Sequence, residues 1–450
     1  MPRKSSKIVT TPIPKELTRS VGDITEEAYK LYGGYVNTSR AIPRLDGLKV
    51  SVARLIYATI LQPRGKWLPS HELVPSIQRW HPHGTVGVEL ANAHLARVGI
   101  FDGDGFFGNT SIDGIVSPPA ATRYTHVKLS DLYCDILKDL TNPEYIHYHE
   151  SPQGEMEPDY LPCPLPFALF IPISTIGLGV GIKTNIPSFT AKSLYSAFIK
   201  NNPNLLKCSV DLIIDPKKSE LKKLWETGRG KITYSYKISR CQSPDGKTEG
   251  ILFETSTDLT TEVFIPGLSK FKPLVEEGKV RIEDITDDAG PKLIISRVPG
   301  ARITIEEIEN LARKCSWKTI EYNCWVTDGV KCFRIPIRDW VKYTVTNYIE
   351  LLKKVTSCKI EKVKFQIEVQ KALPVLADYI INKNPKATDK ELMNNLGISA
   401  EIISAVVQKP ISYLRKNKDT SERIKALKDK LKELQHFNPV KYTEEIIGKL

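Results

Sequence analysis

The sequence predicts a multidomain α+β protein in which a helical N-terminal region, a mixed central region and a helical C-terminal region follow one another. The chain has 450 residues, which is enough for roughly two to four domains with their own cores. Apolar residues recur at helical spacing toward both ends of the chain, whereas short β-like runs alternate with helices between residues 208 and 345. The three regions therefore differ in the helices and strands expected of them.

The N-terminal region contains three expected helices separated by short breaks. Residues 46–62 place their apolar side chains close to one face, and residues 72–80 and 86–98 follow as further helices. The glycine-rich residues 102–109 are expected to form a loop. This order suits a helix-turn-helix or winged-helix module, with the segment around Tyr124 on its wing side.

The central region combines a proline- and glycine-rich stretch, residues 151–190, with the alternating segment that follows. The run of glycines at 177–181 does not predict a dinucleotide site, because the third glycine and a strand–loop–helix unit are missing. Residues 228–231 lack the spacing of a phosphate-binding loop, which disfavours an ATP site. Strands are expected at 231–237, 250–253 and 292–296, and a helix with acidic first turns at 303–314.

From about residue 340 the sequence is helical. Residues 348–381 contain no glycine and one proline, and a short helical segment at 389–408 separates them from a second apolar stripe at 420–435. Two long helices joined in this way fit an antiparallel coiled coil with a knob at its tip. They fit a helical bundle packed on the core equally well.

Composition limits the classes of partner. The net charge of +12 favours an anionic partner, nucleic acid first and a membrane surface second. The sequence has no run of 18 apolar residues, and no apolar core follows the basic residues 1–7, so neither a membrane span nor a secretory signal is expected. The basic start is either a solvated, disordered arm or an arm that contacts DNA phosphates. The eight cysteines form no CxxC pair, which favours a reduced, intracellular protein without a structural zinc site.

Tyr124 stands directly after Arg123 in the stretch 120–125, flanked by small residues and threonine. A free phenol has a pKa near ~10 and is a poor nucleophile at neutral pH. A neighbouring guanidinium favours the phenoxide and also binds a phosphate with its planar fork. Attack on a phosphodiester would give a phosphotyrosine, which keeps the energy of the broken bond. Because an Arg-Tyr pair is also common on surfaces and at core edges, the stretch depends on its context.

That context is an ordered set of motifs at residues 40–49, 81–84, 102–109, 120–125, 177–187 and 228–232. The set resembles the breakage-reunion subunit of type IIA DNA topoisomerases, the gyrase A and topoisomerase IV A family. Each motif alone is weak, but the ordered set is specific and covers the chain from about residue 25 to its end. In length and ending the chain resembles the branch of the family that T-even-type bacteriophages carry.

The resemblance implies four segments: a basic N-terminal arm (1–25), a winged-helix (CAP-like) DNA-cleavage domain with the nucleophilic tyrosine (26–160), an α/β tower domain (161–340), and a long antiparallel coiled coil with a helical C-gate for dimerisation (341–450). The sequence ends after the second long helix. We therefore expect it to lack the C-terminal DNA-wrapping domain of gyrase A and any ATPase segment.

The resemblance also implies the catalytic residues. Tyr124 matches the nucleophile that becomes joined to the 5′ end of the cut strand, and Arg123 would stabilise the charge on the pentavalent phosphorus. Arg40 matches an arginine at the scissile phosphate. His83 matches a histidine near that phosphate, where a hydrogen-bond donor or proton relay is useful.

Six further residues form the DNA-binding set that the resemblance implies: Lys49, Arg54, His81, Thr125, Leu178 and Lys183. Lys49 and Arg54 fit phosphate contacts, which position DNA without reading sequence. Leu178 aligns with an apolar wedge that kinks DNA between base steps, although a buried leucine in a glycine-rich turn is the alternative. His81 is expected to close its loop. The family pattern is broken at Val50, Ala53, Asp104 and Phe106, which puts details of the DNA grip in doubt.

Cofactors and partners follow from the same resemblance. Mg²⁺ and ATP would be bound by a gyrase B-like ATPase/Toprim subunit, and no metal site is expected in this chain. A homodimer joined at the C-gate would relax or decatenate double-stranded DNA in the cytoplasm, which is the host cytoplasm if a phage encodes the chain. Two alternatives remain at this point: a non-catalytic winged-helix DNA-architectural protein, and a self-sufficient nuclease or recombinase that uses the same tyrosine.

Overall fold

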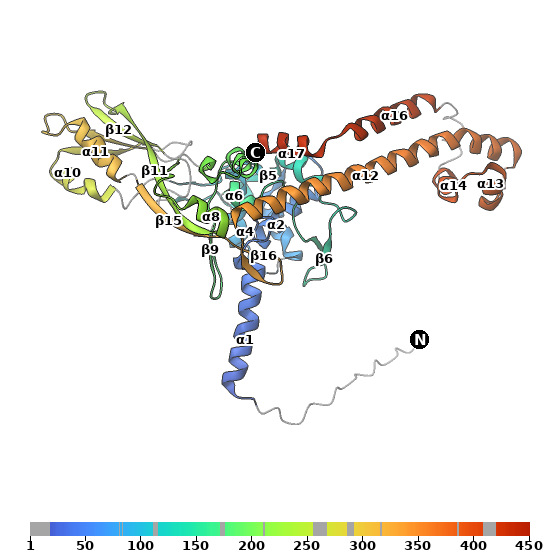
Figure 1. Cartoon of the computed structure of the whole chain (residues 1–450), viewed down its shortest axis with the longest axis horizontal. Coiled ribbons are helices and arrows are strands. Elements are labelled where there is room, and N and C mark those ends of the chain that lie inside the picture. The colour runs from blue at the N-terminus through green and yellow to red at the C-terminus, as the bar shows by residue number, and fades with distance from the viewer. Residues whose placement is uncertain are drawn as a thin grey trace.

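The computed structural model describes residues 19–80, 82, 84–110, 116–171, 176–209, 212–254, 268–285, 292–315, 317–384, 387–407 and 420–450. Three parts extend from a central body (Figure 1). The helix α1 (Val21–Val36) points away on one side, a large sheet extends on a second, and the long helix α12 (Ile337–Asp378) extends on a third. Helix α1 begins within the segment predicted as an arm, because Ser20 caps it by accepting a hydrogen bond from the backbone of Asp23.

The N-terminal part of the body combines helices with a small antiparallel sheet. The helices are α2 (Val50–Ile60), α3 (Ser70–Ser76) and α4 (Val86–Arg97), and the sheet has the order β1 (Leu68–Pro69), β5 (His126–Leu129), β2 (Phe101–Asp104). Fully buried side chains such as Leu55 and Ile56 of α2 join them to the main core. The predicted helices 72–80 and 86–98 are confirmed, with residues 77–79 as a 3₁₀ turn, η2 (Ile77–Arg79).

Two predicted boundaries in this part are wrong. The first helix starts at Val50 rather than at Asp46, because the Asp46 carboxylate accepts hydrogen bonds from the backbone of Leu48 and Leu161 and so holds a loop. Gly47 in that loop has φ +87°, and an added Cβ would lie 2.6 Å from the Phe167 backbone nitrogen. The first half of the predicted loop 102–109 is instead part of strand β2, which pairs with β5.

Short elements complete this part of the body. They are η1 (Asn37–Ala41), β3 (Asn109–Thr110), β4 (Val116–Ser117), η3 (Thr122–Tyr124), α5 (Asp131–Tyr133), η4 (Cys134–Lys138), β6 (Tyr148–Glu150), β7 (Met156–Pro158) and α6 (Phe167–Phe170). Of these, η1 and η4 are π-helical, and β6 and β7 form a hairpin.

The central region forms an eight-stranded antiparallel sheet with the order β13-β14-β12-β11-β15-β9-β8, in which β10 also pairs with β11. The strands are β8 (Ile176–Leu178), β9 (Lys183–Asn185), β10 (Leu212–Ile214), β11 (Arg229–Gln242), β12 (Glu249–Glu254), β13 (Val280–Asp284), β14 (Lys292–Arg297) and β15 (Trp317–Asn323). All three predicted strands lie inside β11, β12 and β14. The predicted helix at 303–314 is confirmed as α11 (Ile305–Cys315).

Short elements surround this sheet: α7 (Ala191–Lys200), η5 (Pro203–Leu205), α8 (Leu221–Thr227), η6 (Ser269–Phe271), α10 (Lys272–Glu276), β16 (Trp325–Thr327) and β17 (Cys332–Arg334). The sheet extends from the body to a separate outer region (Figure 1). Its far end carries α10 and α11, whereas its other end, the β8–β9 hairpin, lies beside the body near α1 (Figure 1).

The C-terminal helices continue from α12 through η7 (Tyr379–Lys383), α13 (Asp389–Leu396), α14 (Ala400–Val407), α16 (Ser421–His436) and α17 (Pro439–Lys449). The first turns of α12 bury Trp340 in the main core, its outer end packs against α14, and α16 returns along it toward the body (Figure 1). The predicted segment 389–408 is two helices, because Gly397 at φ +65° ends α13. Helix α17 lies in the region expected to be helical, although it was not distinguished there as a separate helix, and it packs on α7 and α12.

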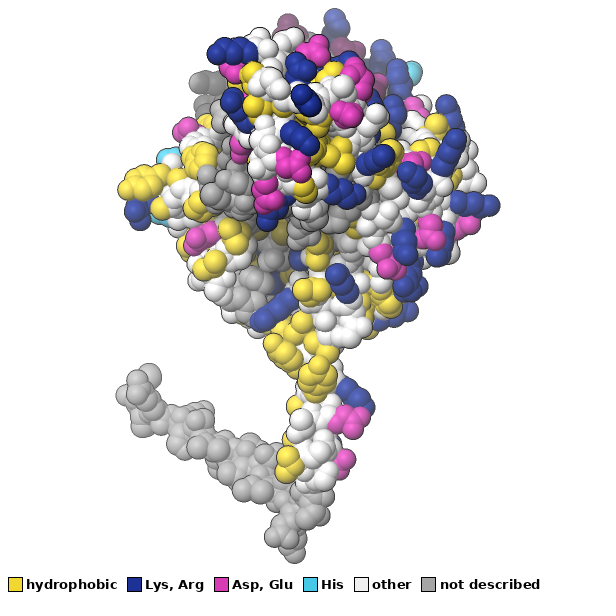
Figure 2. Space-filling model, turned by 90° about the vertical axis from the view of Figure 1, so that its left-hand side faces the viewer, with side chains coloured by type: hydrophobic (Ala, Val, Ile, Leu, Met, Phe, Trp, Pro, Cys, Tyr) yellow, Lys and Arg dark blue, Asp and Glu magenta, His cyan; other side chains and the backbone are white. Residues whose placement is uncertain are grey.

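Two surface properties bear on function. In the part of the chain that the structure describes, no helix combines the length and the apolar composition that a membrane span requires. Helix α1 exposes large apolar side chains along its length, including Ile24, Leu31 and Tyr32, and Figure 2 shows them below the body. On the face that Figure 2 presents, Lys and Arg side chains are spread across the body with Asp and Glu among them.

Candidate active site and nucleic-acid interface

Tyr124 lies on the surface at the end of the 3₁₀ turn η3, immediately before strand β5. Its side chain is 64% exposed, so the phenol is accessible to a macromolecular substrate. The turn is closed by a hydrogen bond from the Tyr124 backbone nitrogen to the Ala121 carbonyl oxygen, at 2.8 Å. The sequence therefore presents an exposed tyrosine on a short turn rather than on a mobile tail.

The backbone around Tyr124 is held from two sides. On one side Gly105, with φ +110°, lets the glycine-rich segment approach so closely that an added Cβ would lie 2.8 Å from the Tyr124 carbonyl oxygen. On the other side Thr125 is buried, and its hydroxyl donates a 2.8 Å hydrogen bond to the Ser70 hydroxyl. The Asn92 side chain donates to the same Ser70 oxygen at 3.1 Å. These contacts fix the turn against α3, α4 and β2.

The orientation of Thr125 corrects one sequence prediction. We expected Thr125 to contact DNA, but its side chain is only 2% exposed and points toward Ser70. Thr125 has an extended backbone and continues the alternation of strand β5, in which Val127 and Leu129 are also buried, because every second side chain of a strand points to the same face. Tyr124, on the 3₁₀ turn before it, is exposed.

Arg123 is also exposed and lies against the tyrosine. Its guanidinium carbon is 4.7 Å from the centre of the Tyr124 ring, which is a cation–π arrangement. A guanidinium at this distance from the ring offers charged N–H donors to an oxyanion that lies beside the tyrosine. Arg123 and Tyr124 are thus two predicted catalytic residues in direct contact.

Arg40 lies on a different element, the π-helical turn η1 that follows α1. The turn is closed by a hydrogen bond from the Ile42 backbone nitrogen to the Asn37 carbonyl oxygen at 3.1 Å. The Arg40 guanidinium lies over the Tyr35 ring, 5.5 Å from its centre, and the residue is exposed. Single π turns inside helices are frequent at functional sites.

Leu178 and Lys183 face each other in the β8–β9 hairpin, where they are paired in register. The Leu178 side chain is 70% exposed, and Lys183 is exposed as well. The alternative of a buried leucine in a glycine-rich turn is therefore wrong. An exposed apolar side chain next to a lysine is suited to contact with DNA, in which an apolar wedge can insert between stacked base faces while a cation meets the phosphates.

Lys49 precedes α2 and its amine donates a 2.9 Å hydrogen bond to the Ile176 carbonyl oxygen at the start of the same hairpin. Burial lowers the pKa of this amine from its ordinary value, because desolvation disfavours the charged form. Lys49 therefore holds the hairpin, and its remaining N–H donors could still face a phosphate.

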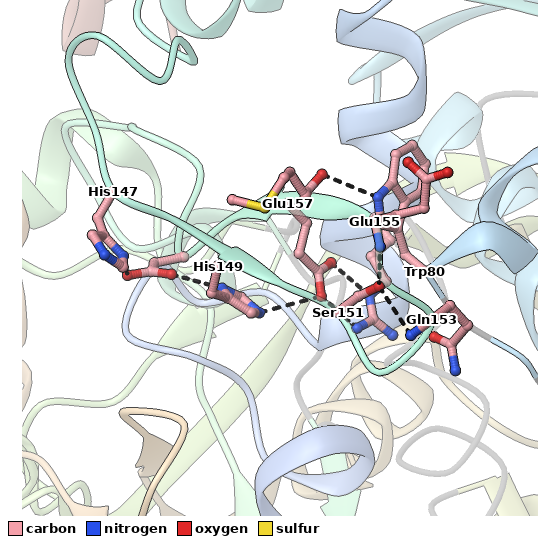
Figure 3. A network of polar contacts seen from close by, with 10 residues as sticks. Trp80, His147, His149, Ser151, Gln153, Glu155 and Glu157 are labelled. Atoms are coloured by element: carbon pink, nitrogen blue, oxygen red, sulfur yellow. Dashed lines mark hydrogen bonds and ion pairs between the residues drawn. The ribbon is translucent and has the colours of Figure 1, made fainter. Parts of the chain in front are cut away.

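We expected Arg54 to contact a DNA phosphate, but its guanidinium is already bound to a carboxylate of the protein. The guanidinium binds both oxygens of Glu157 at 2.7 and 2.6 Å, and the two side chains are only 11% and 4% exposed. Figure 3 shows how Glu157 also faces His149, whose Nε2 lies 3.3 Å from the carboxylate. His149 and His147 both contact Asp159, at 2.7 and 2.8 Å. Arg54 thus joins α2 to the β6–β7 hairpin instead of lying free for a DNA phosphate.

The predicted site residues form two groups, each joined by its own contacts. Tyr124, Arg123 and the inward-facing Thr125 lie on the small sheet, whereas Lys49 and the helix turn that carries Arg40 contact the hairpin that carries Leu178. His81 and His83 lie outside the described residues.

Comparison with known proteins shows which family the chain is similar to. A model of the family described as the A subunit of DNA gyrase/topoisomerase IV matches residues 40–450. The chain is 24% identical over 437 residues to the DNA gyrase A subunit of Kosmotoga olearia, covering 89% of this chain and 53% of that one. It is 26% identical over 451 residues to the DNA topoisomerase 4 A subunit of Staphylococcus aureus, covering 92% of this chain and 54% of that one. The DNA gyrase A subunit of Brachyspira hyodysenteriae is 23% identical over 466 residues, covering 95% and 54%.

The chain belongs to the family of DNA gyrase and topoisomerase IV A subunits. The family match begins at Arg40 and includes every site residue that was predicted from the sequence. The chain spans about half the length of the curated relatives named above.

Other members of the site were missed by sequence reasoning. Ser70 and Asn92 support the tyrosine turn, Glu157 neutralises Arg54, and Asn37 hydrogen-bonds the β8–β9 hairpin. All of these contacts join residues far apart in the chain. Hydrophobic periodicity could not have revealed them, since it reports which face of an element is buried and not which polar partner a side chain meets.

The acidic residues near the tyrosine do not form a metal site among the residues that the structure describes. No group of three or more His, Cys, Asp or Glu side chains there could hold a metal ion. Asp102, on β2, lies 3.2 Å from the Lys128 amine and so has a cation as its neighbour. The expectation that Mg²⁺ is held by another subunit remains a prediction.

Proposed function

We propose that this chain is the DNA-cleaving and rejoining subunit of an ATP-dependent type II DNA topoisomerase, with Tyr124 as the nucleophile. The observation that carries the proposal is the exposed Tyr124 on a braced turn with Arg123 over its ring, within a chain that belongs to the gyrase A family. Relatives named as A subunits of DNA gyrase and of DNA topoisomerase 4 support the same activity.

The proposed reaction is a reversible transesterification. The Tyr124 oxygen gives up its phenolic proton and attacks a DNA phosphorus, and the bond from that phosphorus to the 3′ oxygen of the preceding nucleotide breaks. The tyrosine becomes linked to the 5′ phosphate, and the leaving oxygen takes up a proton to become a 3′ hydroxyl. Arg123 would stabilise the added negative charge on the phosphoryl oxygens, and Arg40 is proposed to bind the same group. His83 is the proposed proton relay. Rejoining is the reverse of these steps.

The wedge proposal assigns Leu178 a mechanical role. The exposed Leu178 would insert between base steps of the DNA to be cut and kink it, at the cost of unstacking. Lys183, Lys49 and the basic surface would hold the backbone on either side. We propose that the helices α2, α3 and α4 and the three-stranded sheet form a winged-helix module that positions the duplex; three helices beside a small antiparallel sheet support this.

Assembly completes the proposed enzyme. Two copies would each cut one strand, giving a staggered double-strand break through which a second duplex passes, so that DNA is relaxed or decatenated. We propose the large sheet as the tower domain, and α12 to α16 as the coiled coil whose tip joins the copies at an exit gate. A gyrase B-like ATPase/Toprim subunit is the proposed source of ATP hydrolysis and of Mg²⁺, which stabilises phosphoryl charge when bound.

The Tyr124→Phe substitution tests this function. The chain is reconstituted with a gyrase B-like subunit, DNA, ATP and Mg²⁺, and the reaction is quenched with detergent to trap covalent adducts. The wild-type chain is expected to carry a DNA-linked peptide that contains Tyr124, whereas Tyr124→Phe gives no adduct and binds DNA as tightly as wild type. Tyr343→Phe is the matched control, since Tyr343 is an exposed tyrosine on a different element, helix α12.

The same assay separates the alternatives. Adduct formation by Tyr124→Phe would contradict the proposed nucleophile. DNA binding and bending without any wild-type adduct would indicate a non-catalytic architectural protein. Cleavage by the wild-type chain without a partner subunit and without ATP would indicate a self-sufficient nuclease or recombinase.

A further inference from the structure

The Asn37 side chain makes a two-point contact with the tip of the β8–β9 hairpin. Its oxygen Oδ1 accepts a 2.7 Å hydrogen bond from the Val180 backbone nitrogen, and its nitrogen Nδ2 donates a 3.0 Å hydrogen bond to the Val180 carbonyl oxygen. The two residues are 143 positions apart. The amide thus satisfies both backbone groups of one residue in the turn, as a neighbouring strand would.

Glycines permit this close contact at three places. A Cβ on Gly179 would lie 2.0 Å from Asn37 Oδ1, and a Cβ on Gly177 would lie 2.0 Å from the Ala41 carbonyl oxygen. A Cβ on Gly33, in α1, would lie 3.1 Å from Val180 Cγ1. The hairpin and the end of α1 therefore fit together without room for an added side chain at Gly177 or Gly179.

The opposite end of the hairpin is fixed to the large sheet. The buried Thr184 hydroxyl lies 3.1 Å from the carbonyl oxygens of Asn323 and Trp325. Asn185 pairs with Asn323 of β15. With its base held by the sheet and its tip held by Asn37, the hairpin presents the exposed Leu178 side chain between two anchor points.

Asn37 is also the first residue of the π turn that carries Arg40, and its carbonyl oxygen accepts the hydrogen bond that closes this turn. We propose that Asn37 is a positioning residue that couples the Leu178 wedge to the Arg40 turn, so that kinking of DNA and alignment of the phosphate-binding arginine occur together. This proposal rests on the proposed function for the roles of Leu178 and Arg40. Asn37 itself touches neither the reacting atoms nor, in the proposal, the DNA.

DNA bending measures the coupling without any chemistry. A duplex with a fluorescent donor and acceptor at its ends is bound to the reconstituted complex, with Tyr124→Phe in every variant so that no strand is cut. Adding Asn37→Ala is expected to lower the ratio of bent to unbent DNA about tenfold, equivalent to about 1.4 kcal/mol. Thr38→Ala is the matched control, because Thr38 lies in the same turn and its hydroxyl donates to the Gly34 carbonyl oxygen of α1 rather than to the hairpin.

Two further variants keep the test decisive if Asn37→Ala merely weakens folding. Gly179→Ala should reduce bending to a similar extent, because its Cβ meets Asn37 Oδ1. In the Asn37→Ala background the same glycine substitution should have little further effect, since the nearest atom outside Asn37, the Ile182 carbonyl oxygen, is 3.4 Å from that Cβ. A mismatch at the kinked step lowers the cost of bending and should restore bending to Asn37→Ala and Leu178→Ala alike.

The outcomes separate this proposal from the proposed function. Bending by Asn37→Ala at the wild-type level, or strictly additive losses for the two substitutions, would overturn the coupling role. A wild-type chain that bends DNA but forms no tyrosine adduct would contradict the proposed function and leave the bending result on Asn37 intact. With Tyr124 restored, Asn37→Ala should lower the rate of adduct formation on matched DNA, and the mismatch should recover it. Failure of that recovery, despite restored bending, would contradict the link to Arg40.

Discussion

At the scale of single residues, the pairing of Arg54 with Glu157 gives this basic side chain of α2 a role in stability rather than in binding DNA. Both side chains are almost fully buried, and the guanidinium binds the carboxylate through two hydrogen bonds. The Glu157 carboxylate would remain buried if Arg54 were removed, with His149 Nε2 3.3 Å away (Figure 3). A buried charge that loses its partner is costly, whereas a buried pair replaced by apolar residues of similar size is often tolerated.

We therefore expect Arg54→Ala to lower the free energy of unfolding by about 3–5 kcal/mol, and the double substitution Arg54→Met with Glu157→Leu to cost less. Denaturant unfolding followed by tryptophan fluorescence measures both.

The salt dependence of DNA affinity tests whether Arg54 also contacts DNA. If Arg54 serves the fold alone, this dependence should be the same in Arg54→Ala as in wild type, at a temperature where the variant remains folded. Lys183→Ala, at the exposed hairpin, should reduce that salt slope by about one. A reduced slope in Arg54→Ala would restore Arg54 as a phosphate contact.

The same pair shows what the sequence could and could not predict at this scale. Tyr124 and Arg123 were identified together because they are adjacent, and their contact in space follows from that adjacency. Arg54 and Glu157 are 103 residues apart, and Thr125 and Ser70 are 55 apart. A motif gives the residue type at each position but not its distant partner, so the inward direction of Thr125 and the neutralisation of Arg54 required the structure.

At the scale of elements, the glycine-rich segment after β2 acts as a support for the nucleophile turn. Gly105 has φ +110°, and its missing side chain leaves room for the Tyr124 carbonyl oxygen and for Thr125. The sequence predicted a loop over residues 102–109 from the number of glycines, but residues 102–104 belong to strand β2. Glycine content reports backbone freedom, whereas the pairing of β2 with β5 depends on a strand about 25 residues away.

Gly105→Ala should displace the Tyr124 turn, because an added Cβ meets backbone atoms that cannot move alone. We expect adduct formation to fall by about tenfold or more, while DNA affinity changes little. Gly99→Ala is the matched control: Gly99 also has a positive φ, but nothing lies within 4 Å of its added Cβ. Comparable losses of adduct in the two variants would show that backbone strain, rather than displacement of the tyrosine, causes the effect.

At the scale of the whole molecule, the described residues form two separate cores. The larger core joins the N-terminal helices, the sheet, the first half of α12 and α17, whereas the smaller lies at the outer end of α12 with α13 and α14. Helix α16 connects the two regions without burying any residue of its own in this chain. We therefore expect the tip to lose structure more easily than the body, which would suit a proposed gate that must part while DNA is held elsewhere.

Leu376→Ala tests whether the tip is an independent unit. Leu376 is fully buried in the smaller core, and truncating a buried leucine costs about 2–5 kcal/mol. Because the larger core is not touched, amide hydrogen exchange should accelerate in α13, α14 and the outer end of α12, while protection in α2, β11 and β15 stays as in wild type. The neighbouring Val375→Ala serves as the control, since Val375 is 50% exposed on the same helix. Accelerated exchange that spreads into α2 and the sheet would mean that the two cores unfold as one, and the proposed exit gate would then need another moving part.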